Sequence, residues 1–133
     1  MIDEELEKIR RRKAEQLLQM KNIPGEVINI LNAQHFDEIL HTHSDTIVVV
    51  DFWASWCGPC MSFAPVFEKL QNEYHQDFIF VKVNVDANQE IAARYRVTGI
   101  PTTLFIKNGG IVNKVVGAMN YQNFKNFLEK LKN

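Results

Sequence analysis

Apolar residues along this chain fall into short continuous runs that alternate with segments of helical spacing. The runs predict β-strands over residues 27–31, 46–52, 78–85, 102–106 and 111–116. Helical spacing and capping residues predict helices over residues 33–40, 57–74, 88–95 and 121–131. Strands that alternate with helices in this order indicate an α/β fold, with a central mixed β-sheet flanked by helices on both faces.

Two local signals support this order. The run from Thr46 to Phe52 is rich in β-branched residues and nearly without polar ones, as expected of a strand buried on both faces. The segment Lys107-Asn108-Gly109-Gly110 lies between the last two predicted strands, and glycine there supplies the positive φ of a tight hairpin.

The first 25 residues follow a different pattern. Acidic residues come first and basic residues follow, an order that suits the helix dipole: Asp3, Glu4, Glu5 and Glu7, then Arg10, Arg11, Arg12 and Lys13. Pro24 and Gly25 then end the helix. We predict a charged helical extension over residues 1–25 and one main domain over residues 26–133. A solvated or weakly docked helix is the favoured interpretation, and a partner-binding, dimerising or nucleic-acid-binding helix is the alternative.

Composition excludes several classes of function. A net charge of -1 gives no reason to expect nucleic-acid binding. No apolar run reaches the roughly eighteen residues that spanning a membrane requires. The amino terminus has neither a basic start nor an apolar core, so a secretory signal is not expected and the cytoplasm is the predicted compartment.

The chain's two cysteines, Cys57 and Cys60, form a Cys-x-x-Cys directly after the buried strand. Thiolate is the nucleophile in disulfide exchange, and a helix amino terminus favours it. We therefore predict that Cys57 attacks and that Cys60, one turn inside the helix, resolves the mixed disulfide. Gly58 permits close approach, and Pro59 suits the first helical turn. This chemistry needs no cofactor.

A zinc site is the main alternative for a Cys-x-x-Cys, and it would need two further ligands. His41 and His43 are the candidates, but both are expected in a polar turn before the central strand. We therefore predict no metal site.

Asp51 is the second unusual residue, because it lies inside an apolar strand. Burial of a carboxylate is costly and raises its pKa toward neutrality, which suits a proton acceptor for Cys60. A carboxylate that is merely satisfied by its neighbours is the alternative. Lys82, in the next predicted strand, is its natural partner, or else a solvent-facing lysine. Pro101, before a buried strand, suits either an edge position or a cis bond.

With these residues assembled, the chain resembles the thioredoxin family. The resemblance covers roughly residues 27–131, through the following segments: Val50 to Cys60, Ala64-Pro65, Val81 to Asp86, Gly99 to Thr102, Lys107 to Gly109 and Val116 to Ala118. It implies the thioredoxin fold, with Cys57 as nucleophile, Cys60 as resolving thiol and Asp51 as proton acceptor tuned by Lys82. It also implies a cis bond before Pro101.

The resemblance further implies an apolar groove that holds the substrate backbone, formed by Trp56, Gly58, Pro59, Gly99, Ile100, Pro101, Gly117 and Ala118. The expected partners are thioredoxin reductase and disulfide-containing client proteins, and the expected state is a monomer or weak dimer. Met61 and Thr98 depart from the well-known members, which carry lysine and arginine there, so partner preference is open.

The predicted function is therefore reduction of protein disulfides, with recharging by thioredoxin reductase. Two alternatives stay open: an enzyme of oxidative folding or isomerisation, and a non-enzymatic binding module. The Gly58-Pro59 pair favours the reductase, because oxidising relatives usually carry histidine between the cysteines.

Overall fold

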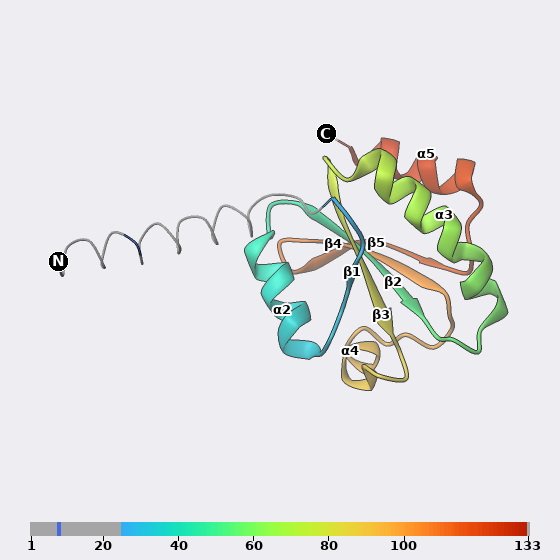
Figure 1. Ribbon diagram of the computed structural model, residues 1–133, viewed down its shortest axis with the longest axis horizontal. Coiled ribbons are helices and arrows are strands. Elements are labelled where there is room, and N and C mark those ends of the chain that lie inside the picture. Colours follow the sequence, from blue (N-terminus) through green and yellow to red (C-terminus); the bar gives the residue numbers. More distant parts are fainter. Residues whose placement is uncertain (1–7, 9–24, 133) are drawn as a thin grey trace.

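The structure is a computed structural model that describes residue 8 and residues 25–132. Apart from Lys8 and Gly25, the predicted extension over residues 1–25 lies outside the described residues. The described part of the chain forms one five-stranded sheet with four helices against it (Figure 1).

The sheet is mixed and has the strand order β1-β3-β2-β4-β5. The strands are β1 (Ile28–Asn29), β2 (Ile47–Trp53), β3 (Phe78–Asn84), β4 (Thr102–Lys107) and β5 (Gly110–Val116). β1 and β2 both run parallel to β3, β4 is antiparallel to β2, and β5 is antiparallel to β4. The central strand β2 is buried from Val48 to Phe52 and pairs on both sides, as its continuous apolar run predicts.

Helices cover both faces of this sheet, which confirms the predicted architecture. The helices are α2 (Ala33–Thr42), α3 (Gly58–Tyr74), α4 (Gln89–Arg94) and α5 (Tyr121–Leu131). On one face, Phe36 of α2 and Ile91 of α4 belong to one apolar core. On the other face, Phe67 of α3 and Phe124 of α5 belong to a second core, with ring centroids 6.0 Å apart (Figure 1).

The first strand is shorter than the predicted range of residues 27–31. The backbone N–H of Ile30 still donates to the carbonyl of Lys82, at 2.9 Å. The next N–H, that of Leu31, lies 3.0 Å from His35 Nδ1 in the first turn of α2. Asn32 accepts from the N–H of His35 as the predicted N-cap. The strand ends early because the backbone N–H of Leu31 donates to His35 in the first turn of α2 and is not available to β3.

Strand direction decides where the site forms. The carboxyl ends of β2, β3 and β5 and the amino end of β4 meet at one edge of the sheet. Three segments therefore converge there: the loop with both cysteines, the loop ending in Pro101, and the turn at Gly117.

Candidate active site

Cys57 is the N-cap residue of α3. Its backbone is extended, and its sulfur lies 3.2 Å from the backbone N–H of Cys60, which donates to it. Pro59 lies in the first turn, where its missing N–H leaves no bond unmade. Cys57 thus lies where unpaired N–H groups and the helix dipole stabilise a thiolate.

Cys57 and Cys60 are joined by a disulfide across this first turn. Cys57 retains 6% exposure and Cys60 only 1%, so Cys57 is the more accessible of the two sulfurs. The Sγ atom of Cys57 lies 3.8 Å from the carbonyl oxygen of Ile100. The sulfur pair thus lies beside the loop that precedes β4.

That loop contains a cis peptide bond between Ile100 and Pro101, as the resemblance implies. The N–H of Gly117 donates to the Pro101 carbonyl at 2.7 Å, which ties the end of β5 to this loop. Gly117 has φ 103°, a left-handed conformation that other residues rarely adopt. Of the predicted groove residues, the structure therefore brings Ile100, Pro101 and Gly117 together, with the Ile100 carbonyl against Cys57.

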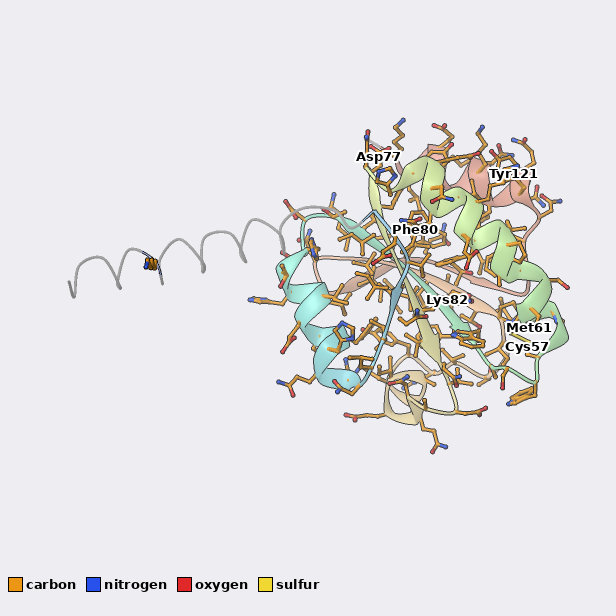
Figure 2. The ribbon with its side chains drawn as sticks, in the orientation of Figure 1. Cys57, Met61, Asp77, Phe80, Lys82 and Tyr121 are labelled. Carbon is orange, nitrogen blue, oxygen red and sulfur yellow. A yellow bond between two sulfur atoms is a disulfide. The ribbon has the colours of Figure 1, made fainter. Side chains whose placement is uncertain are left out.

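The remaining predicted groove residues lie at the same edge. Trp56 is 70% exposed, and Gly58, Pro59 and Ala118 are also exposed, whereas Gly99 is half-buried. Met61 is exposed one residue after Cys60, and Figure 2 shows it beside Cys57 at the amino end of α3. Thr98 is exposed as well.

Sequence reasoning missed two residues at this edge. Asp86 accepts a hydrogen bond from the Trp56 indole N–H at 2.8 Å, and this bond orients the exposed ring. Val116 is an exposed apolar side chain that lies close to Gly99. Both residues come at the carboxyl end of a predicted strand, a position that could have pointed to them.

Asp51 is fully buried in β2, at 0% exposure. Neither carboxylate oxygen has a hydrogen-bond partner among the described residues. Burial raises the pKa of Asp51 to about 7, against the opposing influence of the Lys82 charge. A carboxyl group with this pKa exchanges protons readily at neutral pH.

Lys82 lies in register with Asp51 on the neighbouring strand β3. Its Nζ atom is 4.0 Å from Asp51 Oδ2 and 4.7 Å from the centroid of the Trp53 ring. Its side chain is 13% exposed and lines a cavity of about 480 Å³ with Gln71 and Asn72 of α3. Lys82 is therefore the inward-facing partner and not a solvent-facing strand lysine.

The structure corrects the placement of one of the two histidines considered as metal ligands. His41 lies in the last turn of α2 and not in the turn before β2. His43 is the buried C-cap residue of α2 and begins that turn, where its carbonyl accepts from the N–H of Thr46. The described residues hold no cluster of three or more potential metal ligands. No described helix is long and apolar enough to cross a membrane.

Comparison with known proteins agrees with this geometry. The thioredoxin family model matches residues 27–130. The chain is 53% identical over 76 residues to a thioredoxin from Chlorobaculum thiosulfatiphilum, a match covering 57% of this chain and 70% of that protein. It is 42% identical over 106 residues to a thioredoxin from Haemophilus influenzae, covering 80% of this chain and 97% of that protein.

Solved structures give the same result. Reduced Schistosoma mansoni thioredoxin pre-protein superposes with a TM-score of 0.73 at 41% identity, covering 79% of this chain and 97% of that one. Fasciola hepatica thioredoxin superposes with a TM-score of 0.74 at 37% identity, covering 79% of this chain and 99% of that one. Together with the disulfide at the start of α3, these matches identify a protein-disulfide oxidoreductase. The chain belongs to the thioredoxin family.

Proposed function

We propose that this protein reduces disulfides in client proteins and that Cys57 carries the first step. The observation that supports this most directly is the disulfide at the N-cap of α3, with Cys57 more exposed than Cys60. In the reduced protein, the Cys57 thiolate attacks a client disulfide and forms a mixed disulfide. One client sulfur leaves as a thiolate, which then takes a proton from solvent.

Cys60 completes the reaction in the second step. Its S–H proton passes to the Asp51 carboxylate, and the resulting thiolate attacks the Cys57 sulfur. The Cys57–client bond breaks, the Cys57–Cys60 bond forms, and the second client sulfur leaves as a thiolate. Two electrons have then passed from the dithiol to the client. Lys82, 4.0 Å from Asp51, favours the ionised acceptor.

The client backbone is proposed to lie on the docking surface, which is formed by Trp56, Gly58, Pro59, Gly99, Ile100, Pro101, Gly117 and Ala118. The exposed indole of Trp56, held by Asp86, gives this surface a large apolar contact. Met61 and Val116 extend its apolar area, so clients with apolar residues beside the disulfide should bind best.

The remaining elements of the proposal concern the setting of the reaction. Thioredoxin reductase is the proposed electron donor, because a reductant must restore the dithiol after each cycle. The cytoplasm is the proposed compartment, since both cysteines serve the redox site and none forms a separate structural disulfide. Residues 26–133 are proposed as the catalytic domain and residues 1–25 as an amino-terminal extension of it. The whole chain is proposed to be a monomer or a weak dimer.

Insulin reduction with a thioredoxin reductase tests this function. The wild-type protein should turn over, Cys57→Ser should be inactive, and Cys60→Ser should stop as a trapped mixed disulfide. Ser62→Ala, at the same end of α3, is the matched control and should retain activity. A redox potential close to that of the strongly oxidising periplasmic enzymes would contradict the reducing role and favour oxidative folding.

A further inference from the structure

Asp51 lies at the centre of a row of polar side chains that crosses the sheet. It pairs in register with Lys82 of β3 on one side and with Thr103 of β4 on the other. Residues directly opposite in neighbouring strands project from the same face of the sheet. The residues two positions away from Asp51, Lys82 and Thr103 on their strands project from the same face. They belong to the core under α3 and α5: Val49 of β2, Phe80 of β3 and Phe105 of β4. The polar row therefore faces α3 as well.

Thr103 is fully buried, and its Oγ1 has no hydrogen-bond partner among the described residues. Its neighbour Thr102 is different, because the Thr102 hydroxyl donates to the carbonyl of Gly99. A buried hydroxyl that makes no hydrogen bond is unfavourable, so buried hydroxyls are nearly always paired. The two unpaired oxygens of Asp51 lie on the adjacent strand, on the same face and in register.

The two neighbours of Asp51 differ in what they can bind. Lys82 only donates, so it stabilises the ionised carboxylate alone. A threonine hydroxyl both donates and accepts, and it rotates to suit its partner. Thr103 can therefore pair with Asp51 in either protonation state.

We propose that Thr103 is a positioning residue for the proton acceptor of this protein. Its hydroxyl donates to the ionised Asp51 carboxylate, directly or through one water molecule. After the Cys60 proton has reached Asp51, the same hydroxyl accepts a hydrogen bond from the protonated carboxyl. Thr103 itself neither gains nor loses a proton. This inference rests on the proposed role of Asp51.

Few other groups act on Asp51 from the surrounding elements. Lys82 is the charged residue that faces it from β3. Cys57 and Cys60, when reduced, are the titratable groups at the start of α3, and Glu68 of α3 lines the cavity beside Lys82. The β4 residues on this face nearest to Asp51, Thr103 and Phe105, carry no charge, and the next one, Lys107, is exposed at the far end of the strand. An effect of Thr103 can therefore be separated from a change in nearby charge.

The test follows the Asp51 carboxyl carbon by NMR as pH is varied, in the oxidised and the reduced protein. Thr103→Val keeps the shape of the side chain and removes the hydroxyl. A hydroxyl binds a carboxylate more strongly than a neutral carboxyl, so Thr103→Val should raise the Asp51 midpoint by about one pH unit. Thr103→Ser keeps the hydroxyl and should restore the midpoint to within about 0.3 pH units of the wild type.

Single-turnover kinetics provide the second readout. Because less Asp51 is then ionised at pH 7, Thr103→Val should slow mixed-disulfide resolution about three- to fivefold at that pH, and less than about twofold at pH 9. In an Asp51→Asn background, the same substitution should leave the pH profile unchanged.

Three results would overturn the inference: an unmoved Asp51 midpoint in Thr103→Val, a serine variant that behaves like valine, or an equal kinetic effect in the Asp51→Asn background. If Asp51→Asn by itself alters the pH profile, the role of Asp51 stands and these results contradict the role of Thr103 alone. An unaltered profile in Asp51→Asn would instead remove the proposed role of Asp51, and that of Thr103 with it.

Discussion

At the scale of the residue, Asp51 shows how two opposing effects set a proton affinity. Burial raises its pKa to about 7, and the Lys82 charge at 4.0 Å opposes that rise without cancelling it. Desolvation prevails because the carboxylate is fully enclosed, whereas Lys82 retains some exposure and its Nζ atom also lies over the Trp53 ring. The same burial that suits Asp51 to accept a proton also destabilises the fold when it is ionised.

Asp51→Asn should therefore stabilise the protein in a pH-dependent way. In the folded protein the Asp51 pKa of about 7 lies above its ordinary value of 3.8, so the folded state holds the proton more tightly. The contribution of Asp51 to stability is thus fully present below about pH 4 and is lost as pH rises toward 7. Urea unfolding should show a gain for Asp51→Asn of up to about 4 kcal/mol at pH 8.

This gain should vanish at pH 4, where the wild-type carboxyl is protonated and resembles the amide. Asp77→Asn is the matched control, because Asp77 is exposed and its ion pair with Lys132 is worth less than about 1 kcal/mol. A gain that is independent of pH would show that ionisation of Asp51 is not the cause.

The same substitution should also slow catalysis. Without the carboxylate, Cys60 must lose its proton to water, so Asp51→Asn should slow mixed-disulfide resolution about tenfold or more near pH 7. The deficit should shrink toward pH 9, where hydroxide removes the thiol proton. Stopped-flow measurement with a client disulfide reads this rate directly. A variant that is only more stable, with an unchanged rate, would reduce Asp51 to a buried destabilising group.

At the scale of the element, local signals in the sequence decided most boundaries. The hairpin between β4 and β5 turns at Asn108 and Gly109, with φ of 52° and 76°, as its glycines predict. The short strand β1 is the exception, because its end depends on His35, a side chain in the following helix. The spacing of apolar residues alone does not show that a side chain in the first turn of a helix will accept a backbone N–H from the end of the preceding strand.

Gly109→Ala should destabilise the hairpin for a purely conformational reason. No atom lies within 4 Å of where its Cβ would stand, so the cost is that of a positive φ, about 1–2 kcal/mol. Gly110→Ala is the matched control: its φ is not in the left-handed region, and its Cβ would meet only the Lys107 carbonyl at 3.8 Å. Thermal unfolding should show a lower Tm for Gly109→Ala and little change for Gly110→Ala. Equal losses in the two variants would contradict this explanation.

At the scale of the whole molecule, the segment that matches the thioredoxin family, residues 27–130, contains the sheet and its two helical layers except for Leu131, the last residue of α5. The site draws on β2, β3, β4, β5 and α3, so it depends on four neighbouring strands of the sheet and not on any single element. The side-chain hydrogen bonds and the ion pair described at the site join residues within 51–117. The cavity beside Lys82 is also lined by Glu26, Val27 and Asn29.

A chain that begins at Glu26 should therefore fold and reduce insulin at the full-length rate, within about twofold, because the complete core is retained. Analytical ultracentrifugation of both chains separates the possible roles of residues 1–25. A change in oligomeric state with unchanged turnover would identify an interaction element. Loss of turnover in a folded short chain would contradict the proposed domain boundary.

The sequence by itself determined the order of strands and helices, the Cys-x-x-Cys at a strand–helix junction and the buried position of Asp51, because periodicity, capping and turn chemistry act over a few residues. The sequence also offered Lys82 as a partner for Asp51, and the tertiary structure decided against the solvent-facing alternative. Only the tertiary structure showed that Asp86 meets Trp56 and that Thr103 lies opposite Asp51. Strand register and direction set these pairs. Both depend on the helices packing against the two faces of the sheet together. Adjacent polar residues in β4 illustrate this, since the Thr102 hydroxyl donates to the carbonyl of Gly99 in its own loop while Thr103 lies in register with Asp51.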